Sequence, residues 1–333
     1  MALKILRAGV LTTVQDLGRL GWQRYGVPVS GVMDEMSHRV ANLLVGNTDG
    51  EATLEITITG PRIEFTEDTL VALCGGDFQP TVDRLPAPMA RPLLARAGAV
   101  LDLAQCRLGA RAYLAVAGGF DVPLVLGSKS TYLRGGFGGF EGRALKRGDL
   151  LPTAPRPSGL YPSLWARLAA GAAFVAPKWS VEANIALMAH RHHNIRFVPG
   201  RHWEGFAPEV RERLVASQYR IGPSSDRMGY RLDGPGLPFP DAGSLVSEGV
   251  TFGTIQVPPD GKPIVLMANR QTTGGYPRIG EVAAVDLPLL AQLPPGDTVR
   301  LSLTTLERSQ ELYLERERQL ALMREAVQMR LRE

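Results

Sequence analysis

A succession of short apolar segments is the feature that most constrains the fold of this chain. Each segment is rich in Val, Ile, Leu or Thr and is bounded by Gly, Pro or Asp, which is typical of β-strands joined by turns. The chain contains 37 Gly and 25 Pro, scattered rather than clustered, which favours many turns over a disordered tail. We therefore expect a mainly β (β-rich α+β) fold. The predicted strands are Leu54–Thr59, Thr69–Leu73, Ala99–Leu103, Arg111–Ala117, Ile195–Val198, Thr254–Val257, Pro263–Ala268 and Thr298–Thr304.

Helices are expected at only a few places. Met36–Val45 has apolar residues at helical spacing and stops near a Gly-Asn pair. Shorter candidates are Val181–Ala189, Pro208–Ala216 and Asp286–Leu293. Residues 305–333 contain no Gly or Pro and many charge pairs four residues apart, which predicts a long exposed C-terminal helix. Its one apolar stripe either packs back on the chain or contacts a partner, and it consists of Leu312, Leu320, Met323, Val327 and Leu331.

A faint internal repeat appears in four blocks whose order is kept. For example, "GVPVSGVMDEMSHRVA" in the first part resembles "IGPSSDRMGYRLDG" in the second, and Glu55 then aligns with Glu248. We infer two related β-subdomains. The expected domains are 1–190, which includes a glycine-rich insertion, then 195–304, and then a C-terminal helix over 305–333.

Composition excludes several function classes. Hydrophobic residues make up 44% of the chain and charged residues 21%, as in an ordinary globular protein. The net charge is only +4, and basic residues alternate with acidic ones, so no polybasic stripe for nucleic acid is present. Cys74 and Cys106 form no disulfide framework, and we see neither a signal peptide nor an apolar run long enough to span a membrane. A cytoplasmic location is therefore expected.

The segment "RQTTGGYPRIGEV" is the first candidate site. It follows a predicted core strand and combines hydroxyls, an amide and a phenol with two glycines. Glycines let backbone approach a ligand closely and expose its N–H groups, while the amide and hydroxyls recognise a carbonyl, amide or carboxylate. The alternative is a tight hairpin with incidental polar residues. The candidate residues are Gln271, Thr272, Thr273, Gly274, Gly275 and Tyr276.

The glycine-rich segment 127–149 is the second candidate. It lacks the Gly-x-x-x-x-Gly-Lys-Ser/Thr spacing of a phosphate-binding loop. It is read either as a mobile flap whose Lys129, Arg134 and Arg143 suit an anionic ligand, or as a connection packed by two Phe residues.

Other charged residues leave their roles open. Arg227 either binds a carboxylate in bidentate geometry or belongs to a structural ion pair. Glu55 is read as structural, whereas Glu248 remains open between a general base and a structural group. "HRHH" at 190–193 has no evident third ligand, so we expect no metal site there.

Several longer motifs resemble one family. The chain is similar to the carboxyltransferase-type family that includes allophanate hydrolase subunit 2, part of the urea carboxylase carboxyltransferase domain, and the C subunit of 5-oxoprolinase (KipA-like proteins). Asn269 departs from the Asp usual in the family. The matching motifs are "VQDLGR" (14–19), "GVP.SG.MD" (26–34), "ANLLVGN" (41–47), "GARAYLAVAGG" (109–119), "GSKSTYLRGGFGGFEGRAL" (127–145), "SDRMGYRL" (225–232), "SEGV" (247–250), "IQVPPDG" (255–261) and "RQTTGGYP" (270–277).

The resemblance implies two related cyclophilin-like β-barrel subdomains and work beside sister subunits. It implies ATP-dependent hydrolysis of 5-oxo-L-proline to L-glutamate together with the A and B subunits of 5-oxoprolinase, of which the B subunit is the allophanate hydrolase subunit 1 or KipI-like protein. Which of the subunits binds ATP stays open. The chain has no Met-Lys-Met biotinylation motif, so we expect no covalently attached biotin. The alternatives are a KipA-like regulatory protein that antagonises a kinase inhibitor, and a carboxyltransferase subunit of a urea or allophanate pathway.

Within this reading, the site residues take specific roles. Gln271, Arg227 and Tyr276 are the predicted catalytic residues, with Arg227 holding the carboxylate of the substrate and Gln271 its lactam group. Opening a lactam after ATP has activated its carbonyl oxygen requires anion stabilisation more than a strong nucleophile. The predicted substrate-binding residues are Thr272, Thr273, Gly274, Gly275, Tyr230, Glu248 and Arg134.

Overall fold

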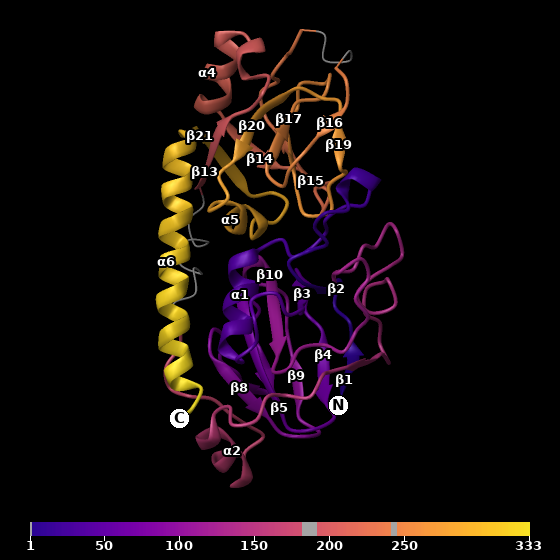
Figure 1. Cartoon of the computed structure of the whole chain (residues 1–333), viewed down its shortest axis with the longest axis vertical. Coiled ribbons are helices and arrows are strands. Elements are labelled where there is room, and N and C mark those ends of the chain that lie inside the picture. The colour runs from indigo at the N-terminus through magenta and orange to yellow at the C-terminus, as the bar shows by residue number, and fades with distance from the viewer. Residues whose placement is uncertain (1, 182–191, 241–244) are drawn as a thin grey trace. The chain divides into compact units, whose positions relative to one another are not determined.

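The computed structural model of the protein describes residues 2–181, 192–240 and 245–333 (Figure 1). Contacts divide these residues into two compact units. The first unit contains residues 2–19, 34–181 and 319–333, and the second contains 20–33, 192–240 and 245–318. Each unit is therefore built from segments that are separated in the sequence. The predicted domains, in contrast, are continuous stretches of the chain.

Two six-stranded sheets form the first unit. The described strands of one sheet, in spatial order, are β11 (Leu150–Pro152), β1 (Ala2–Arg7), β4 (Arg62–Phe65), β9 (Val100–Asp102), β6 (Thr81–Val82) and β7 (Leu85–Pro86). Those of the other are β12 (Phe174–Val175), β8 (Pro92–Ala95), β5 (Thr69–Asp77), β10 (Leu108–Val116), β3 (Thr53–Thr57) and β2 (Leu11–Gln15).

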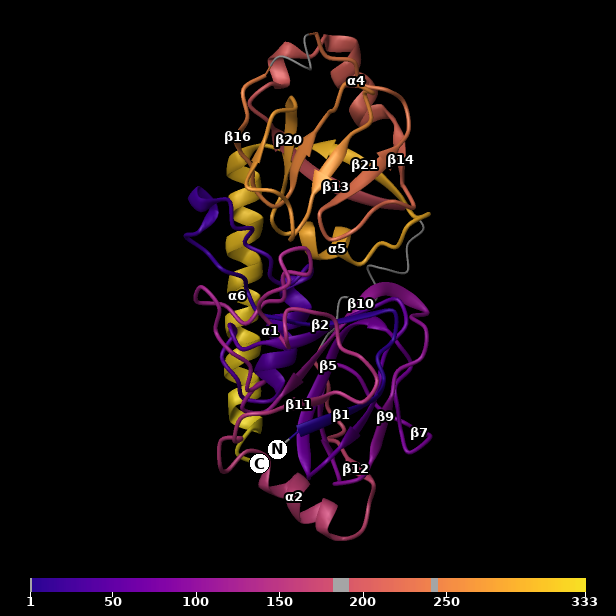
Figure 2. The ribbon, with the colours of Figure 1, turned by 90° about the vertical axis from the view of Figure 1, so that its right-hand side faces the viewer.

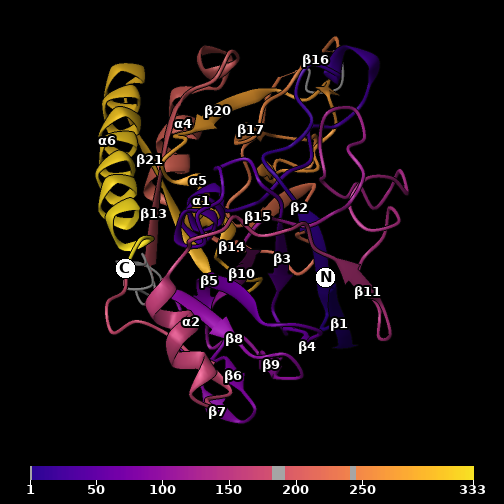
Figure 3. The same cartoon turned by 60° about the horizontal axis from the view of Figure 1, so that its bottom comes forward.

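One apolar core is shared by both sheets of the first unit. Leu3 and Phe65 of the first sheet belong to the same buried cluster as Leu54 and Leu114 of the second. Burying such side chains contributes about 1.5–3 kcal/mol each, so this cluster is the main source of stability. The helix α1 (Glu35–Leu44) packs on β10 and β5, and α2 (Pro162–Ala169) lies beside β8 (Figure 3).

Most of the described strands of the second unit close into a barrel (Figure 2). Adjacent strands are antiparallel except for the first and last along the chain, which pair in parallel and close the barrel. In spatial order they are β13 (His192–Pro199), β20 (Arg278–Val282), β17 (Thr254–Gln256), β18 (Ile264–Leu266), β15 (Gly229–Asp233), β14 (Gln218–Ile221) and β21 (Thr298–Leu303).

A few further elements complete the second unit. The helices α4 (Pro208–Ala216) and α5 (Leu287–Ala291) supply the core residues Leu214 and Leu290. A two-stranded ribbon joins β16 (Glu248–Gly249) to β19 (Thr273–Gly274). Two single turns of 3₁₀ helix occur at η1 (Gln23–Tyr25) and η2 (Trp203–Gly205).

The C-terminal helix α6 (Leu306–Arg330) is present as predicted, and its residues are divided between the two units after Arg318. Leu320 and Val327 of the predicted stripe are fully buried. The backbone N–H of Tyr161 also donates to the carbonyl of Leu331, at 2.7 Å. The final turns of α6 are thus fastened to the first unit, as expected for a helix that packs back on the chain.

The mainly β fold with a barrel and a C-terminal helix is confirmed, and each of the eight predicted strands overlaps an observed strand. The predicted helices around Met36–Val45, Pro208–Ala216 and Asp286–Leu293 are also present. The candidate Val181–Ala189 lies almost entirely outside the described residues. That the two units are related subdomains stays a prediction, because the described strands of the first unit form two sheets rather than one closed barrel.

Candidate functional site

The segment Gln271–Tyr276 leaves the barrel after β18 and builds one side of the β16–β19 ribbon. Gln271, Thr273 and Tyr276 are exposed, whereas Gly274 is buried. The amide of Val250 donates to the carbonyl of Thr272 at 3.1 Å and extends the ribbon by one residue. The segment therefore presents polar side chains to solvent from a hydrogen-bonded backbone.

The two glycines of this segment fit close against their neighbours. A Cβ atom on Gly274 would lie 2.3 Å from Nε2 of Gln256, and one on Gly275 would lie 3.2 Å from Oγ of Ser247. Both distances are too short for ordinary packing of a methyl group. Gly274 thus lets the ribbon lie directly on the barrel strand β17, and Gly275 lets it lie close to Ser247. This packing role accompanies the ligand role predicted for both glycines.

Glu248 is held by two arginines. Its carboxylate accepts from Nη2 of Arg278 at 2.6 Å and pairs with Nη1 of Arg201 at 2.8 Å. Arg278 also donates to the carbonyl of Gly249 at 3.1 Å. Glu248 lies directly opposite Gly274 in the ribbon, so the structure brings these two predicted residues together. Because Glu248 bonds to Arg278 of the barrel strand β20, it fixes the ribbon to the barrel.

Arg227 and Tyr230 lie deeper than the exposed segment. The buried guanidinium of Arg227 donates through Nη2 to the carbonyl of Gly31, and Oδ1 of Asn269 lies 3.4 Å from the same nitrogen. Tyr230 is buried in the barrel core, with its hydroxyl 3.5 Å from the carbonyl of Ala291. The roles of both residues toward a ligand stay predictions.

Arg134 is exposed and belongs to the first unit. The glycine-rich segment around it is closely packed: a Cβ atom on Gly138 would lie 2.1 Å from the carbonyl oxygen of Ser130, and one on Gly139 would lie 1.9 Å from Oγ1 of Thr131. Phe137 stacks edge-on against Tyr132 at 5.5 Å between ring centroids. These contacts match the packed connection rather than the mobile flap.

The other two cations of that segment have carboxylate partners. Nζ of Lys129 lies 2.6 Å from Oε1 of Glu51, and Arg143 makes a bidentate pair with Asp149. That pair raises the pKa of the Arg143 guanidinium above its usual range. Both cations are therefore already paired with carboxylates of this chain.

Two of the family-like motifs meet at a buried carboxylate. Asp16 of "VQDLGR" accepts from the hydroxyls of Ser128 at 2.6 Å and Ser130 at 2.5 Å and from the amide of Lys129 at 2.6 Å. Arg19 of the same motif donates to the carbonyl of Ser130. These motifs thus specify a structural junction, which sequence spacing alone does not show.

A second buried polar cluster lies between α1 and its sheet, and sequence reasoning found only part of it. The Tyr113 hydroxyl accepts from the amide of Asp34 at 2.8 Å and donates to Glu55 at 2.9 Å. Asp34 caps α1 by accepting from the amide of Ser37 at 3.0 Å. This agrees with the structural reading of Glu55. The signal that was available is the Asp-x-x-Ser spacing before an amphipathic segment.

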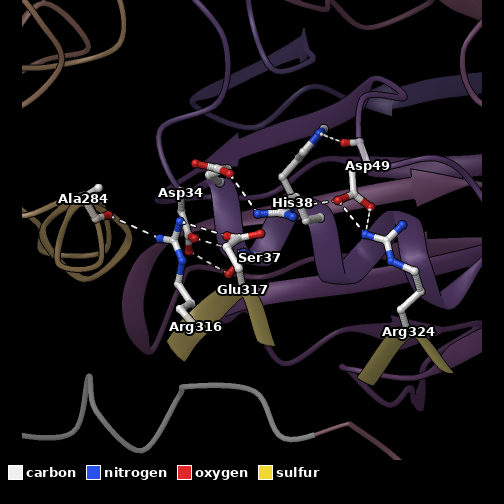
Figure 4. Close-up of polar contacts among 10 residues, drawn as sticks. Asp34, Ser37, His38, Asp49, Ala284, Arg316, Glu317 and Arg324 are labelled. Atoms are coloured by element: carbon white, nitrogen blue, oxygen red, sulfur yellow. Dashed lines mark hydrogen bonds and ion pairs between the residues drawn. The ribbon is translucent and has the colours of Figure 1, made fainter. Parts of the chain in front are cut away.

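His38 completes this cluster. Its Nε2 lies 2.9 Å from the carbonyl oxygen of Asp49 (Figure 4). Its Nδ1 lies 2.9 Å from the hydroxyl of Thr53. Because a carbonyl oxygen only accepts, the proton sits on Nε2 and Nδ1 accepts from Thr53. Burial lowers the pKa of His38 to about 4, so the ring is neutral. It acts as a hydrogen-bonded core residue.

No group of three or more His, Cys, Asp or Glu residues that would hold a metal ion occurs in the part of the chain that the structure describes. The "HRHH" segment falls partly outside that part, since 190 and 191 are among the residues left undescribed. Among the described helices, none is both long and apolar enough to cross a membrane.

Comparison with known proteins defines the class. Residues 25–303 match the family model described as "Carboxyltransferase domain, subdomain A and B". The chain therefore belongs to the carboxyltransferase domain family, subdomains A and B. It is 39% identical to the C subunit of 5-oxoprolinase from Escherichia coli over 92% of this chain and 93% of that protein. The corresponding C subunit from Haemophilus influenzae is 34% identical over 92% and 95%.

Solved structures agree with the family. The Kluyveromyces lactis urea carboxylase matches with a TM-score of 0.83 and 30% identity, covering 95% of this chain but 28% of that one. The protein TTHA0988 matches with a TM-score of 0.77 and 33% identity, covering 90% of this chain and 55% of that one. The chain thus spans about a quarter of the urea carboxylase and about half of TTHA0988.

Proposed function

We propose that this chain is one component of an ATP-dependent 5-oxoprolinase complex that hydrolyses 5-oxo-L-proline to L-glutamate with the A and B subunits. The proposal rests on the similarity to two proteins that bear the name of the 5-oxoprolinase C subunit. In each comparison the match covers more than 90% of this chain and of the relative. The urea enzymes instead contain this region as a minor part of a much longer chain.

The chemistry proposed for the complex needs little from a nucleophilic side chain. The lactam oxygen takes the γ-phosphoryl group of ATP and releases ADP. One water then adds to the activated carbon, the ring C–N bond breaks to leave an acyl phosphate, and a second water hydrolyses that to glutamate and phosphate. Donors that hold the substrate and its developing negative charge are the main requirement.

The exposed segment Gln271–Tyr276 is the part of this chain that we assign to the substrate. Gln271 and the hydroxyl of Thr273 are exposed on a ribbon that Glu248 and Arg278 fix to the barrel. A rigid support limits the conformational entropy lost when polar side chains bind a ligand. Tyr276, half exposed at the end of the segment, offers a phenol donor or a stacking face.

A loop of the second unit suits the contact with a sister protein. Leu20, Trp22 and Tyr25 are exposed within six residues, and Arg24 lies over the Tyr25 ring at 4.7 Å. Trp, Tyr and Arg are the residue types enriched at the energetic centres of protein interfaces. The loop is held in shape, since the amide of Tyr25 donates to the carbonyl of Trp22 at 2.9 Å and Met33 is buried in the barrel core. We assign it to a protein partner because this chain covers only 55% of TTHA0988, so that protein contains further sequence besides the matching part.

The rival functions predict different partners. A KipA-like regulator binds a kinase inhibitor and makes no glutamate, whereas a component of a urea or allophanate pathway depends on a biotin carrier. The test of the proposal is whether glutamate formation from 5-oxo-L-proline and ATP by the A and B subunits requires this chain. Binding to the B subunit without such a requirement favours the regulator.

A further inference from the structure

Arg270 is a buried cation with weak partners. Its side chain is only 8% exposed. Its hydrogen bonds go to two backbone carbonyls, those of Val250 and Met267, and both are long at 3.5 Å. Within residues 2–181, 192–240 and 245–333, no carboxylate lies within ion-pair distance of its guanidinium. A guanidinium has five N–H donors, so most of its donor capacity has no strong acceptor.

Glu281, the acidic residue whose charge acts on Arg270, is already engaged. Its Oε2 accepts from the hydroxyls of Thr251 at 2.9 Å and Thr254 at 2.8 Å. It acts on Arg270 only through space, and burial outweighs it, lowering the pKa of Arg270 to about 10. By contrast, Arg196 makes a bidentate pair with Asp286, with Nε and Nη2 at 2.9 and 2.5 Å from its two oxygens. Arg270 is therefore buried, but among the described residues it has no carboxylate partner such as Asp286 provides for Arg196.

The surroundings of Arg270 strengthen any charge interaction made there. The ring of Phe252 lies 5.9 Å from its guanidinium carbon, and the side chains of Val250 and Met267 are buried. Water-poor surroundings raise the energy of an ion pair relative to one at the surface and make an unpaired buried charge costly. A ligand that brings the missing negative charge therefore gains more here than at an exposed arginine.

A second, independent donor without a partner lies under the same ribbon. Nε2 of Gln256 is buried, makes no hydrogen bond with the residues that the structure describes, and lies against Gly274. Gly274 is two residues beyond Thr272, whose carbonyl accepts from the amide of Val250, the residue that Arg270 contacts. Two residues of a strand span about 7 Å. Arg270 and Gln256 are thus two buried donors that contact the residues of one short ribbon or its extension.

We propose that Arg270 is the carboxylate-binding residue of this site, with the amide of Gln256 as a second donor to the same organic acid. A planar carboxylate matches the fork of one guanidinium and needs one positive charge. The identification of that acid as 5-oxo-L-proline rests on the proposed function, whereas the existence of the site does not.

Calorimetric titration tests the assignment with two probes, 5-oxo-L-proline and 2-pyrrolidinone, the same lactam without the carboxylate. The chain is assembled with the A and B subunits and carries Arg270→Gln, Gln256→Leu or Arg231→Gln. Arg231 is an exposed arginine of β15 and serves as the matched control. We expect Arg270→Gln to weaken 5-oxo-L-proline binding at least tenfold, Gln256→Leu to weaken it less, and Arg231→Gln to leave it unchanged. Binding of 2-pyrrolidinone should not respond to Arg270→Gln.

A measurement on the wild-type chain covers the case in which Arg270→Gln does not fold. The Nε–H resonance of Arg270, assigned with the conservative Arg270→Lys variant, should shift on titration with 5-oxo-L-proline and not with 2-pyrrolidinone. An unshifted resonance at saturation, or equal losses from Arg270→Gln and Arg231→Gln, would overturn the assignment. The two proposals fail separately. If turnover requires the chain but is unchanged by Arg270→Gln, the Arg270 site is wrong and the proposed function stands. If carboxylate binding depends on Arg270 but no turnover occurs, the site stands and the proposed function is wrong.

Discussion

Nε2 of Gln256 lies where a side chain on Gly274 would have to go, 2.3 Å from the position of its Cβ atom. The ribbon that carries the candidate site therefore packs on the barrel strand β17 at this contact, in addition to the Glu248–Arg278 pair that ties it to β20. The close contact explains why the candidate segment has so little side-chain bulk at its centre.

The first prediction concerns this contact. We expect Gly274→Ala to destabilise the protein by about 1–3 kcal/mol, because the methyl group overpacks a buried site. Gln256→Ala in the same chain should restore part of the loss, so the two changes should be non-additive in urea unfolding. Gly249→Ala, on the opposite strand with nothing within 4 Å of its Cβ position, is the control and should cost little. Additive effects would show that the contact does not constrain the ribbon.

His38 predicts a pH dependence of stability. Its folded-state pKa of about 4 is below the value of about 6.5 for an unfolded chain, so the unfolded state binds more protons between these values. The stability that the neutral ring contributes is therefore complete above pH 6.5 and is lost as pH falls toward 4, by roughly 3 kcal/mol in total. Unfolding free energies measured from pH 7 to 4.5 should show this slope, and His38→Gln should flatten it. An NMR titration that finds His38 protonated at pH 6 would contradict the prediction without any variant.

The end of α6 is fastened by an ion pair that joins distant parts of the sequence. Nη2 of Arg324 lies 2.7 Å from both oxygens of Asp49, which also accepts from Nε of Arg39 at 2.9 Å (Figure 4). Burial works against ionisation of Asp49, but the hydrogen bonds from Arg324 and Arg39 outweigh it and lower its pKa. We expect Asp49→Asn to cost about 1 kcal/mol and to speed hydrogen exchange in the last turns of α6. Arg330→Ala, which removes an exposed pair with Glu333, should change neither measurement appreciably.

The aromatic loop predicts a partner contact. Trp22→Ala and Tyr25→Ala should each weaken association with the sister subunits by roughly tenfold or more, because aromatic anchors dominate interface energies. The free chain should keep its stability, since both side chains are exposed. Tyr313→Ala on α6, of comparable exposure to Trp22, is the control for surface aromatics. If Trp22→Ala and Tyr25→Ala weaken association no more than Tyr313→Ala does, the loop is not the interface.

Much of the fold could be predicted from sequence because its determinants are local. The alternation and turn residues around Thr53–Thr57 or Thr298–Leu303 specify strands, and the charge pattern of Leu306–Arg330 specifies a helix. The partners of side chains are not local. Glu248 is bound by Arg278 and Arg201, and neither pairing has a spacing that identifies it.

The candidate site shows the same division. The segment Gln271–Tyr276 stood out because polar groups and glycines follow a core strand, and the structure places it on an exposed ribbon. Arg270, one residue earlier, gave no signal, since what distinguishes it is burial without a carboxylate partner. Burial of that kind depends on Phe252 and Val250, which reach it through the tertiary fold.

Glutamate formation from 5-oxo-L-proline and ATP, measured with the purified A and B subunits in the presence and absence of this chain, tests the central claim most directly. We predict ATP-dependent glutamate release that requires the chain and rises with its concentration until the complex is saturated. Equal glutamate release without the chain, while the chain still binds the B subunit, would contradict its role in an oxoprolinase complex.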